Sequence, residues 1–555
     1  MKMNIKNIAL LAASAMLTLA GCTKDFEEIN TDPYGIADSE VSFSDLFNEA
    51  QLSVYYNQSN GNWEYQLIQN LNADLWSGYF AIPTAYNGGL NNDNYYMMNG
   101  WNGYTLNYML LHVIKPTSQL LKVEDLADDL KGIALILKVA GAHKMVDTYG
   151  PAPYSEAMKG GISVKYDSEE EAYTQMLSEL EEATSCLTSW LDANGGADKS
   201  NRISWDKMCN KSQKTWLQLG NTLRLRLAMR LAMVAPALAK SNAEAACANK
   251  YGLLKDVDVE VKDGNTRNPL GVILRDYNDC AISANWETIL KGYNDPRLEA
   301  TTLGVGWNNK GDIFDQNGNA TGWEGKIKGI RNGLKVQGTF YKTYSIPIMP
   351  LSGGPYSTDM PLPIMSRAEA SFLQAEGKLR GWNTGSGSVK EYYQEGIRHS
   401  FGKYGLDDKV AAYMEGTSTQ IDYEDPHNPA NNIAAVNDLP VKFMDEGTDE
   451  QKLGQIITQK WIACFPEGLN AWAEYRRTGY PHLFPIPSDN CNVQSEYLAG
   501  SKEDLIKYGV RRLPFAEGER NANPAGLQSG KDILSARGQK DAIDERIWWD
   551  TGKNF

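Results

Sequence analysis

The sequence contains few of the residues and motifs on which enzyme catalysis usually depends. It has only five histidines in 555 residues, and none lies four residues from another, so a helical pair of metal-binding histidines is excluded. The nucleophile-elbow, zinc-protease, phosphate-loop and dinucleotide-binding motifs are also missing. A pair of glycosidase carboxylates has no fixed spacing, so that class stays open among the 69 acidic residues. We therefore expect a protein that is not an enzyme and needs no cofactor.

Closely spaced cysteines and long apolar runs are missing as well. The six cysteines beyond Cys22 lie far apart with no C-x-x-C, which excludes the common zinc signatures. Isolated thiols are the default interpretation, and one or two disulfides stay open. After Cys22 no apolar run reaches about 18 residues, so we expect a body that does not cross a membrane. The formal net charge of −15 argues against nucleic acid as a partner.

The first residues of the chain have the form of a lipoprotein signal. Two early lysines precede an apolar stretch from Ile8 to Ala20, which has the length of a signal-peptide core. The stretch ends in Leu-Ala-Gly-Cys at 19–22, a bacterial lipobox in which the Cys22 thiol takes a diacylglycerol before cleavage. We expect residues 1–21 to be removed and Cys22 to anchor the protein in the membrane by its acyl chains. The alternative is an ordinary secretory signal that happens to carry a cysteine.

Helical periodicity dominates the rest of the chain. The helix pair within 366–401 spans a little over 34 residues, with small residues where the helices would pack, as in a tetratricopeptide unit. Segments 63–101 and 255–363 are rich in Gly, Asn, Asp and aromatic residues, and they predict loops with a few short strands. Pro236 marks the end of one helical stretch. The predicted helices cover 44–55, 104–121, 126–146, 168–191, 212–233, 366–380, 389–401, 449–463 and 468–477.

The two loop-rich segments hold the best candidates for a ligand site. The chain has 14 Trp and 29 Tyr but only 13 Phe, and rings with a polar group are favoured at binding surfaces. Aromatic faces cover the apolar side of a sugar ring while Asn and Asp bond its hydroxyl groups, so this mixture favours an oligosaccharide over an oligopeptide. The alternative is that these rings only pack long loops onto the helices. The candidate ligand-binding residues are Trp76, Tyr79, Tyr86, Asn91, Asp93, Tyr95, Tyr96, Trp307 and Trp323, and Trp101, Tyr341 and Tyr344 lie in the same segments.

One segment has a weak likeness to a calcium-binding loop. Asp315, Asn317 and Asn319 place oxygen ligands at alternate positions. The loop lacks the glycine at position six, and Lys326 stands where a bidentate glutamate is expected. These three residues are the sequence's candidates for a structural calcium ion, and an Asn/Gly turn is the alternative.

Several motifs, spread over most of the chain, resemble one family of lipoproteins. They are DFEEINTDP at 25–33, LKGYNDPRL at 290–298, SRAEASFLQAE at 366–376, AWAEYRRTGYP at 471–481 and RRLPF at 511–515. In this order they resemble the SusD/RagB-like outer-membrane lipoproteins, particularly the branch often called SusD-like 2. Most of these residues are predicted to be structural. Trp461 and Trp472 are expected in the core, and the arginine pairs at 476–477 and 511–512 are expected to anchor loops.

The resemblance implies a fold, a role and a partner. The fold is dominated by α-helices: a single domain over residues 22–555, in which a right-handed tetratricopeptide-like superhelix supports a loop-rich ligand-binding face. The partner is a SusC-like TonB-dependent outer-membrane transporter, on which the lipoprotein sits as a lid that captures oligosaccharides, or oligopeptides in some members. The acidic cluster at 25–28 resembles the surface-export signal of Bacteroides-type lipoproteins, so we expect the protein to face the cell exterior. A stand-alone glycan-binding adhesin is the alternative.

Overall fold

The structure is a computed structural model that describes residues 42–55, 62–261, 268–308, 310–348 and 361–555. Contacts divide the chain into two compact units, Met1–Leu46 and Phe47–Phe555, and the fold is described for the second. The signal sequence and Cys22 lie outside the described residues, so their roles stay predictions. Within the described ranges, no helix is long and apolar enough to cross a membrane. The six cysteines beyond Cys22 are all unpaired thiols.

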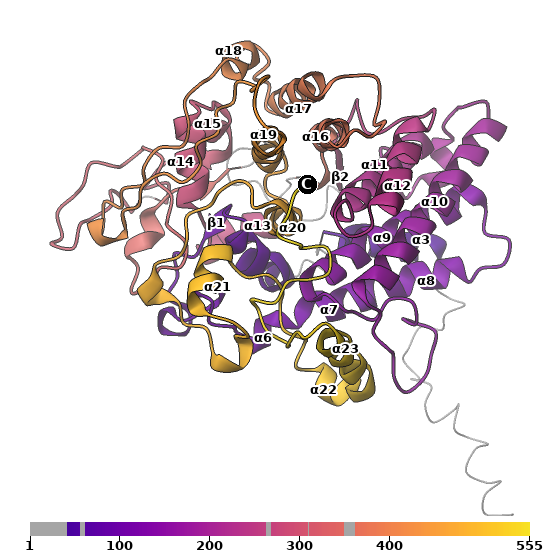
Figure 1. The fold of residues 1–555 in the computed structure, drawn as a ribbon, viewed down its shortest axis with the longest axis horizontal. Helices are drawn as coiled ribbons and strands as arrows, with labels where there is room; N and C mark the ends of the chain where they lie inside the picture. The colour runs from indigo at the N-terminus through magenta and orange to yellow at the C-terminus, as the bar shows by residue number, and fades with distance from the viewer. Residues whose placement is uncertain (1–41, 56–61, 262–267, 309, 349–360) are drawn as a thin grey trace, which may run out of the picture. The chain divides into compact units, whose positions relative to one another are not determined.

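Four consecutive helices form the first part of the scaffold, drawn in purple and magenta in Figure 1. Each packs on the next: α9 on α10, α10 on α11, and α11 on α12. Because α11 lies between neighbours, 16 of its 18 residues are buried. The preceding helix α11 already ends at Arg230, and Pro236 instead opens α12, a helix that the sequence does not predict. The four helices are α9 (Asp128–Tyr149), α10 (Glu169–Ala193), α11 (Gln213–Arg230) and α12 (Pro236–Ala248).

A second group of helices completes the scaffold. Helix α16 packs against both α17 and α19, and its contact with α11 joins the two groups. The predicted bounds of these helices agree with the structure to within two residues. Together the two groups confirm the predicted fold, a helical tetratricopeptide-like scaffold with few strands. The helices of this group are α16 (Arg367–Leu379), α17 (Val389–Lys403), α19 (Asp449–Ala463) and α20 (Gly468–Thr478).

Capping residues explain where three of these helices begin. At α10, the Ser168 side chain accepts from the backbone N–H of Glu171, whose carboxylate accepts from the N–H of Ser168. The same reciprocal pattern occurs at α17 with Ser388 and at α19 with Thr448. Each box satisfies backbone N–H groups that the first helical turn leaves without partners. These local signals are the reason that the sequence predicts the starts of these helices well.

Buried ion pairs join the scaffold helices. Arg226 of α11 donates to both carboxylate oxygens of Glu369 on α16. Lys460 of α19 lies 3.3 Å from the same carboxylate. Arg477 of α20 binds Glu376 of α16 through two bonds of 2.6 and 2.7 Å. Burial of these charges is tolerated because each faces an opposite charge and the arginines are hydrogen-bonded to the carboxylates, so removing one partner would leave another charge uncompensated.

The structural roles predicted for the family motifs are confirmed. Trp461 and Trp472 are 3% and 1% exposed. Arg511 donates to Asp550 at 2.7 Å, and Arg512 donates to the carbonyl of Tyr149 at 3.0 Å. These arginines therefore attach the C-terminal segment to the scaffold.

The segment from residue 63 is helical before it becomes a loop, which corrects the loop prediction for its first part. Its polar side chains are buried and find distant partners: Gln69 donates to the carbonyl of Pro466, and Asn70 donates to the Cys280 sulfur. Such residues look like loop residues in the sequence because their partners lie hundreds of positions away. The elements up to residue 121 are α3 (Phe43–Ser53), α4 (Asn62–Tyr65), η2 (Gln66–Ala73), α5 (Asp74–Trp76), η3 (Tyr86–Gly89), η4 (Asn92–Asn94), α6 (Asn99–Asn102), α7 (Tyr104–Met109), η5 (Leu110–Ile114) and α8 (Lys115–Leu121).

Three short antiparallel strand pairs connect distant parts of the chain. Strand β1 (Phe80–Ala81) pairs with β3 and so joins the two loop-rich segments, with Phe80 opposite Ile282. The other pairs are β2–β6 and β4–β5. Segment 255–363 also contains short helices, which corrects its description as loop and strand alone. Its elements are β2 (Val259–Val261), α13 (Pro269–Val272), η7 (Ile273–Tyr277), β3 (Ala281–Ile282), α14 (Ala284–Gly292), α15 (Arg297–Thr301), β4 (Thr302–Leu303), η8 (Phe340–Thr343), β5 (Ile346–Pro347) and β6 (Leu362–Met365).

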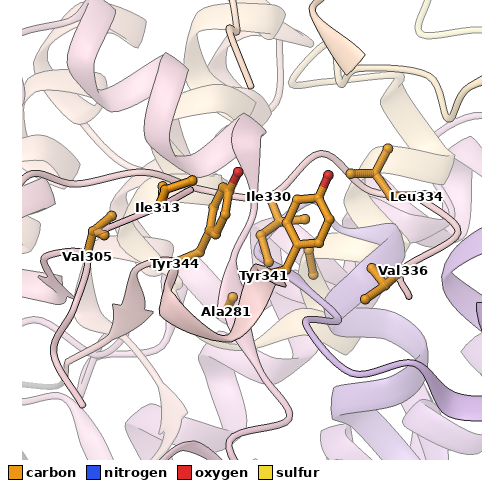
Figure 2. Packing of buried hydrophobic residues seen from close by; sticks show 9 residues of the cluster. Ala281, Val305, Ile313, Ile330, Leu334, Val336, Tyr341 and Tyr344 are labelled. Carbon is orange, nitrogen blue, oxygen red and sulfur yellow. The ribbon is translucent and has the colours of Figure 1, made fainter. Parts of the chain in front are cut away.

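A small apolar cluster supports the loops of segment 255–363. Figure 2 shows Tyr341 and Tyr344 beside Ile330 in this cluster. Both tyrosine hydroxyls donate to the buried carboxylate of Asp425. The loops are therefore held by a core of their own. The remaining short elements lie before this segment, at 200–203, and after it, from residue 410 onward. These are η6 (Ser200–Ile203), α18 (Val410–Met414), η9 (Pro429–Asn431), η10 (Ser488–Asn490), η11 (Ser495–Tyr497), α21 (Lys502–Tyr508), α22 (Glu519–Ala522) and α23 (Pro524–Ala536).

Candidate functional site

The two loop-rich segments meet at Asp279. Its carboxylate accepts hydrogen bonds from Thr84 and Tyr86 of the first segment and lies 3.6 Å from Lys342 Nζ of the second. The Asn308 side chain donates to the carbonyl of Lys342 at 3.0 Å. The structure thus brings together both of the regions in which the sequence places the ligand site.

Aromatic rings surround this junction. Tyr86 and Trp101, both half-buried, meet edge to face with their ring centroids 5.4 Å apart. Phe340 is 56% exposed and stacks on His427 at 4.8 Å. The His427 ring is fixed in turn, because its Nδ1–H donates to the carbonyl of Phe314 at 2.7 Å. We call this surface the aromatic loop face, and define it by Tyr86, Trp101, Asp279, Trp307, Asn308, Phe340, Lys342 and His427.

A left-handed turn holds Tyr86 in place. Asn87, Gly88 and Gly89 all have positive φ, a conformation that glycine and asparagine adopt most readily. At Gly89 a Cβ atom would lie 2.7 Å from the carbonyl oxygen of Val336, so only glycine lets the two loops approach this closely. The turn leaves Asn87 exposed at the surface. It therefore presents an amide group to solvent next to the Tyr86 ring.

Five of the nine predicted ligand-binding residues are buried in the protein, so their predicted role does not fit their positions. Tyr79 is 0% exposed and donates its hydroxyl to the carbonyl of Trp461. Trp76 donates its ring N–H to the carbonyl of Asn92, and its ring lies 5.0 Å from that of Trp472. These aromatic side chains fill the space between the loop and the scaffold, which is the packing role that the sequence left open.

The other three buried candidates shape the loop itself. The Asn91 side chain caps the short helix η4, and Tyr95 takes the left-handed conformation at its end. Asp93 accepts from the Asn332 amide at 2.9 Å. Burial raises the pKa of Asp93 to about 6, although the hydrogen bond from Asn332 opposes the shift. The side chains of the asparagine-rich run therefore form their hydrogen bonds within the protein, and few of these groups remain for a ligand.

The remaining four candidates, Tyr86, Tyr96, Trp307 and Trp323, are half-buried. Tyr86 and Trp307 belong to the aromatic loop face. Trp323 packs against the apolar cluster of Figure 2, and Lys328 Nζ lies 4.7 Å from its ring. Lys291 Nζ lies 5.1 Å from the same ring, so the ring is in contact with the cluster and close to two lysines of the protein. Trp323 is therefore placed mainly as a packing residue.

Sequence reasoning missed Asp279, Phe340 and His427. The sequence analysis instead names the neighbouring Tyr341 and Tyr344 as residues of the candidate segments. Their side chains are buried, at 6% and 1% exposure. In a loop the side chains follow no fixed period, so the sequence carries no signal for which aromatic residue points outward.

The candidate calcium loop is closed by its own hydrogen bonds. Asp315 Oδ1 accepts from the backbone N–H groups of Asn317 and Asn319 at 2.9 and 2.8 Å. The Asn319 amide nitrogen donates to the other oxygen at 3.1 Å. N–H groups thus point to the oxygens that a cation would need, so the residues fit an Asn/Gly turn better than a calcium site. Calcium binding here stays a prediction.

Within the described residues, no group of three or more His, Cys, Asp or Glu side chains is placed to hold a metal ion. The fold and the aromatic loop face together define a helical scaffold protein that presents loops suited to binding a ligand.

Comparison with known proteins assigns the chain to a family. Residues 28–550 match the sequence profile of the SusD-like family, described as SusD and RagB outer membrane lipoproteins. The chain therefore belongs to the SusD-like family of outer-membrane lipoproteins. A comparison with curated proteins gives no match.

Solved structures of SusD homologues resemble the chain over nearly its whole length. A chitin-binding SusD homologue from Flavobacterium johnsoniae is 36% identical, with a TM-score of 0.81, covering 92% of this chain and 99% of the homologue. A SusD homologue from Bacteroides vulgatus is 29% identical, also at 0.81, covering 92% and 98%. One from Bacteroides uniformis is 28% identical, at 0.80, covering 92% and 99%.

Proposed function

We propose that the protein is the surface-exposed, lipid-anchored capture subunit of a SusC-like TonB-dependent importer, and that it binds oligosaccharides for uptake. The observation that carries the proposal is the aromatic loop face, where the exposed Phe340 ring and several half-buried rings surround a charged and amide-bearing junction. The chitin-binding homologue supports the ligand class, since it shares 36% of its sequence with this chain. Membership of an outer-membrane lipoprotein family supports the location.

The chemistry of the face suits a neutral sugar. A ring that buries about 100 Å² against a sugar contributes roughly 2–3 kcal/mol. Two such contacts and a few hydrogen bonds give affinities between about micromolar and millimolar, which allow release as well as capture. Asp279, Asn308 and Asn87 provide polar groups next to the rings. An oligopeptide would depend more on hydrogen bonds between its own backbone and backbone groups of the protein. The polar groups of this face are mainly side chains, which suit a sugar better.

The proposed role is binding without catalysis, so a partner must move the ligand. Capture alone transports nothing across a membrane, and a channel has to lie next to the binding site. As a lid, the protein would keep one lasting contact with the transporter and part from it elsewhere, and the two interfaces should therefore differ in strength. The aromatic loop face should turn toward the channel.

Calorimetric titration of the purified protein tests the ligand site. Chitin oligosaccharides, maltooligosaccharides and short peptides are titrated in parallel. Replacing both Trp101 and Phe340 with alanine should weaken oligosaccharide binding about 1,000-fold or more, because each lost ring contact costs roughly 2–3 kcal/mol. Phe555→Ala is the control, since Phe555 is 51% exposed but lies outside the face. Unchanged binding by the double variant would overturn the site, and turnover of the sugar would overturn the binding role.

Two further measurements separate the alternatives. Mass spectrometry of ligand that co-purifies from native membranes should find glycan, and peptide there would transfer the same role to oligopeptides. Crosslinking in cells should recover a complex with a large outer-membrane barrel. Recovery of the protein only as a monomer would favour a stand-alone adhesin.

A further inference from the structure

Helix α21 separates two clefts of similar size. Their volumes are about 490 and 440 Å³, within the range of roughly 300–1,000 Å³ that is usual for small-molecule sites. Tyr508, Arg511 and Arg546 line both clefts. The larger cleft also contains three carboxylates, whereas the smaller one has none among its lining residues. The two clefts therefore differ in charge.

The smaller cleft concentrates positive charge on an acidic protein. Five arginine and lysine residues line it, against a formal net charge of −15 for the whole chain. We call it the basic cleft, and its cations are Arg476, Arg477, Lys507, Arg511 and Arg546.

These cations are only partly neutralised by the protein. Arg477 is paired with Glu376 and Glu474, whereas Arg511 and Arg546 share one carboxylate, Asp550, at 2.7 and 2.6 Å. Arg476 and Lys507 form no ion pair with any residue in the described ranges. Arg476 is 1% exposed, donates to the carbonyls of Trp472 and Arg511, and has a buried Nη2 without a hydrogen-bond partner. The surplus positive charge favours an anion in the cleft.

The other walls of the basic cleft suit a sugar ring. Tyr508 is 39% exposed, and Tyr475 and Leu483 add aromatic and apolar surface. Lys507 Nζ lies 4.8 Å from the Tyr508 ring, so charge and ring surface lie side by side. A guanidinium group matches the geometry of a carboxylate with two parallel hydrogen bonds. A ligand with one carboxylate on a compact ring would use all of these features.

We propose that the basic cleft is a second binding site, which takes the carboxylate-bearing unit of an acidic sugar such as a uronate. The basic cleft shares no residue with the aromatic loop face, so the two are separate sites. A site for acidic sugars would widen the range of ligands beyond the neutral glycans of the proposed function. The carboxylate lies against Arg546 and Lys507, and the ring packs on Tyr508.

Titration of the full-length protein with glucuronate, galacturonate and glucose tests the proposal. The uronates should bind at least about tenfold more tightly than glucose, which is the effect of one charged hydrogen bond. Lys507→Gln and Arg546→Gln should each weaken uronate binding about tenfold. Raising the salt from 0.15 to 1 M shortens the screening length from about 8 to 3 Å and should also weaken it.

Lys502→Gln is the matched control, because Lys502 is an exposed lysine on the same helix that lines neither cleft. It should bind uronate as the parent does. Equal binding of glucose and uronate, or equal effects of Lys502→Gln and Lys507→Gln, would overturn the proposal. If Lys507→Gln still bound uronate but no longer formed the complex with the transporter, the proposal would be overturned, and the cleft would instead be a contact surface for the transporter. The Trp101 and Phe340 double variant should keep uronate binding, which separates this site from the aromatic loop face.

Discussion

Replacing Glu369 with glutamine should destabilise the scaffold far more than the same change at an exposed glutamate. The Glu369 carboxylate is 0% exposed and accepts from Arg226 and Asn470, with Lys460 Nζ 3.3 Å away. Burial alone would raise the pKa of Glu369, but the charges of Arg226 and Lys460 outweigh burial and hold it well below its usual range. The group is therefore ionised in the folded protein, and glutamine would leave buried cations without their partner.

The size of the effect follows from burial and chain length. Removing one partner of a buried ion pair costs about 3–5 kcal/mol of unfolding free energy. An unfolding entropy of about 2.1 cal/mol/K per residue gives roughly 1 kcal/mol/K for about 500 residues, so Tm should fall by about 3–5 °C. Because the folded pKa is depressed, this stabilisation is present above the ordinary glutamate pKa and is lost as pH falls. The difference between variant and parent should shrink below about pH 4.

Scanning calorimetry at pH 7 and pH 3.5 checks both statements. Glu415→Gln is the control, since Glu415 pairs with Lys442 at 2.8 Å while its side chain is 66% exposed. An exposed pair contributes about 1 kcal/mol or less, so Tm should change by about 1 °C at most. If the two variants lowered Tm equally, the buried ion pairs would not be what joins these helices.

Three further predictions concern the anchor, a buried acid and a packed glycine. Cys22→Ala should abolish fatty-acid labelling and release the protein from the membrane, and continued labelling would refute the lipobox. Burial raises the pKa of Asp74 to about 8, so folding takes up a proton between about pH 4 and 8 and stability falls as pH rises, by up to about 1.4 kcal/mol per unit. Urea unfolding of Asp74→Asn should show a flatter pH dependence, and an unchanged slope would contradict this. At Gly292 a Cβ would lie 2.0 Å from the Thr419 carbonyl oxygen, so Gly292→Ala should cost about 1–3 kcal/mol or more, whereas Gly518→Ala meets open space and should cost little in the same calorimetric scan.

Predictions from local signals agreed best with the structure. Helix α10 begins at the capping box of Ser168 and Glu171, and both residues of the box lie within four positions. The arginine pairs behave as anchors because a buried guanidinium needs acceptors, wherever they lie. The sequence also predicts a ligand site in the loop-rich segments, since their composition is unlike that of the helices.

Helix η2 shows where composition misleads. Gln69, Asn70 and Asn72 are polar but only 4%, 1% and 2% exposed. Their hydrogen-bond partners include Pro466 and Cys280, which the folded chain alone brings near. Seven of the eight residues of η2 are buried, polar and apolar alike, and its Gln and Asn content leads the sequence to predict a loop here.

The sequence by itself predicts the lipobox, the bounds of α16, α17, α19 and α20 to within two residues, and the resemblance to the family, because each depends on residues close together in the chain. It predicts α9 and α11 to within three residues and misses α12. Only the tertiary structure decided which rings face outward. Tyr79 packs on Trp461, 382 positions away, while Phe340 is left exposed beside His427. The basic cleft likewise joins residues of α20 and α21 with Arg546. Exposure and charge of a site depend on long-range packing, which no local pattern of residues encodes.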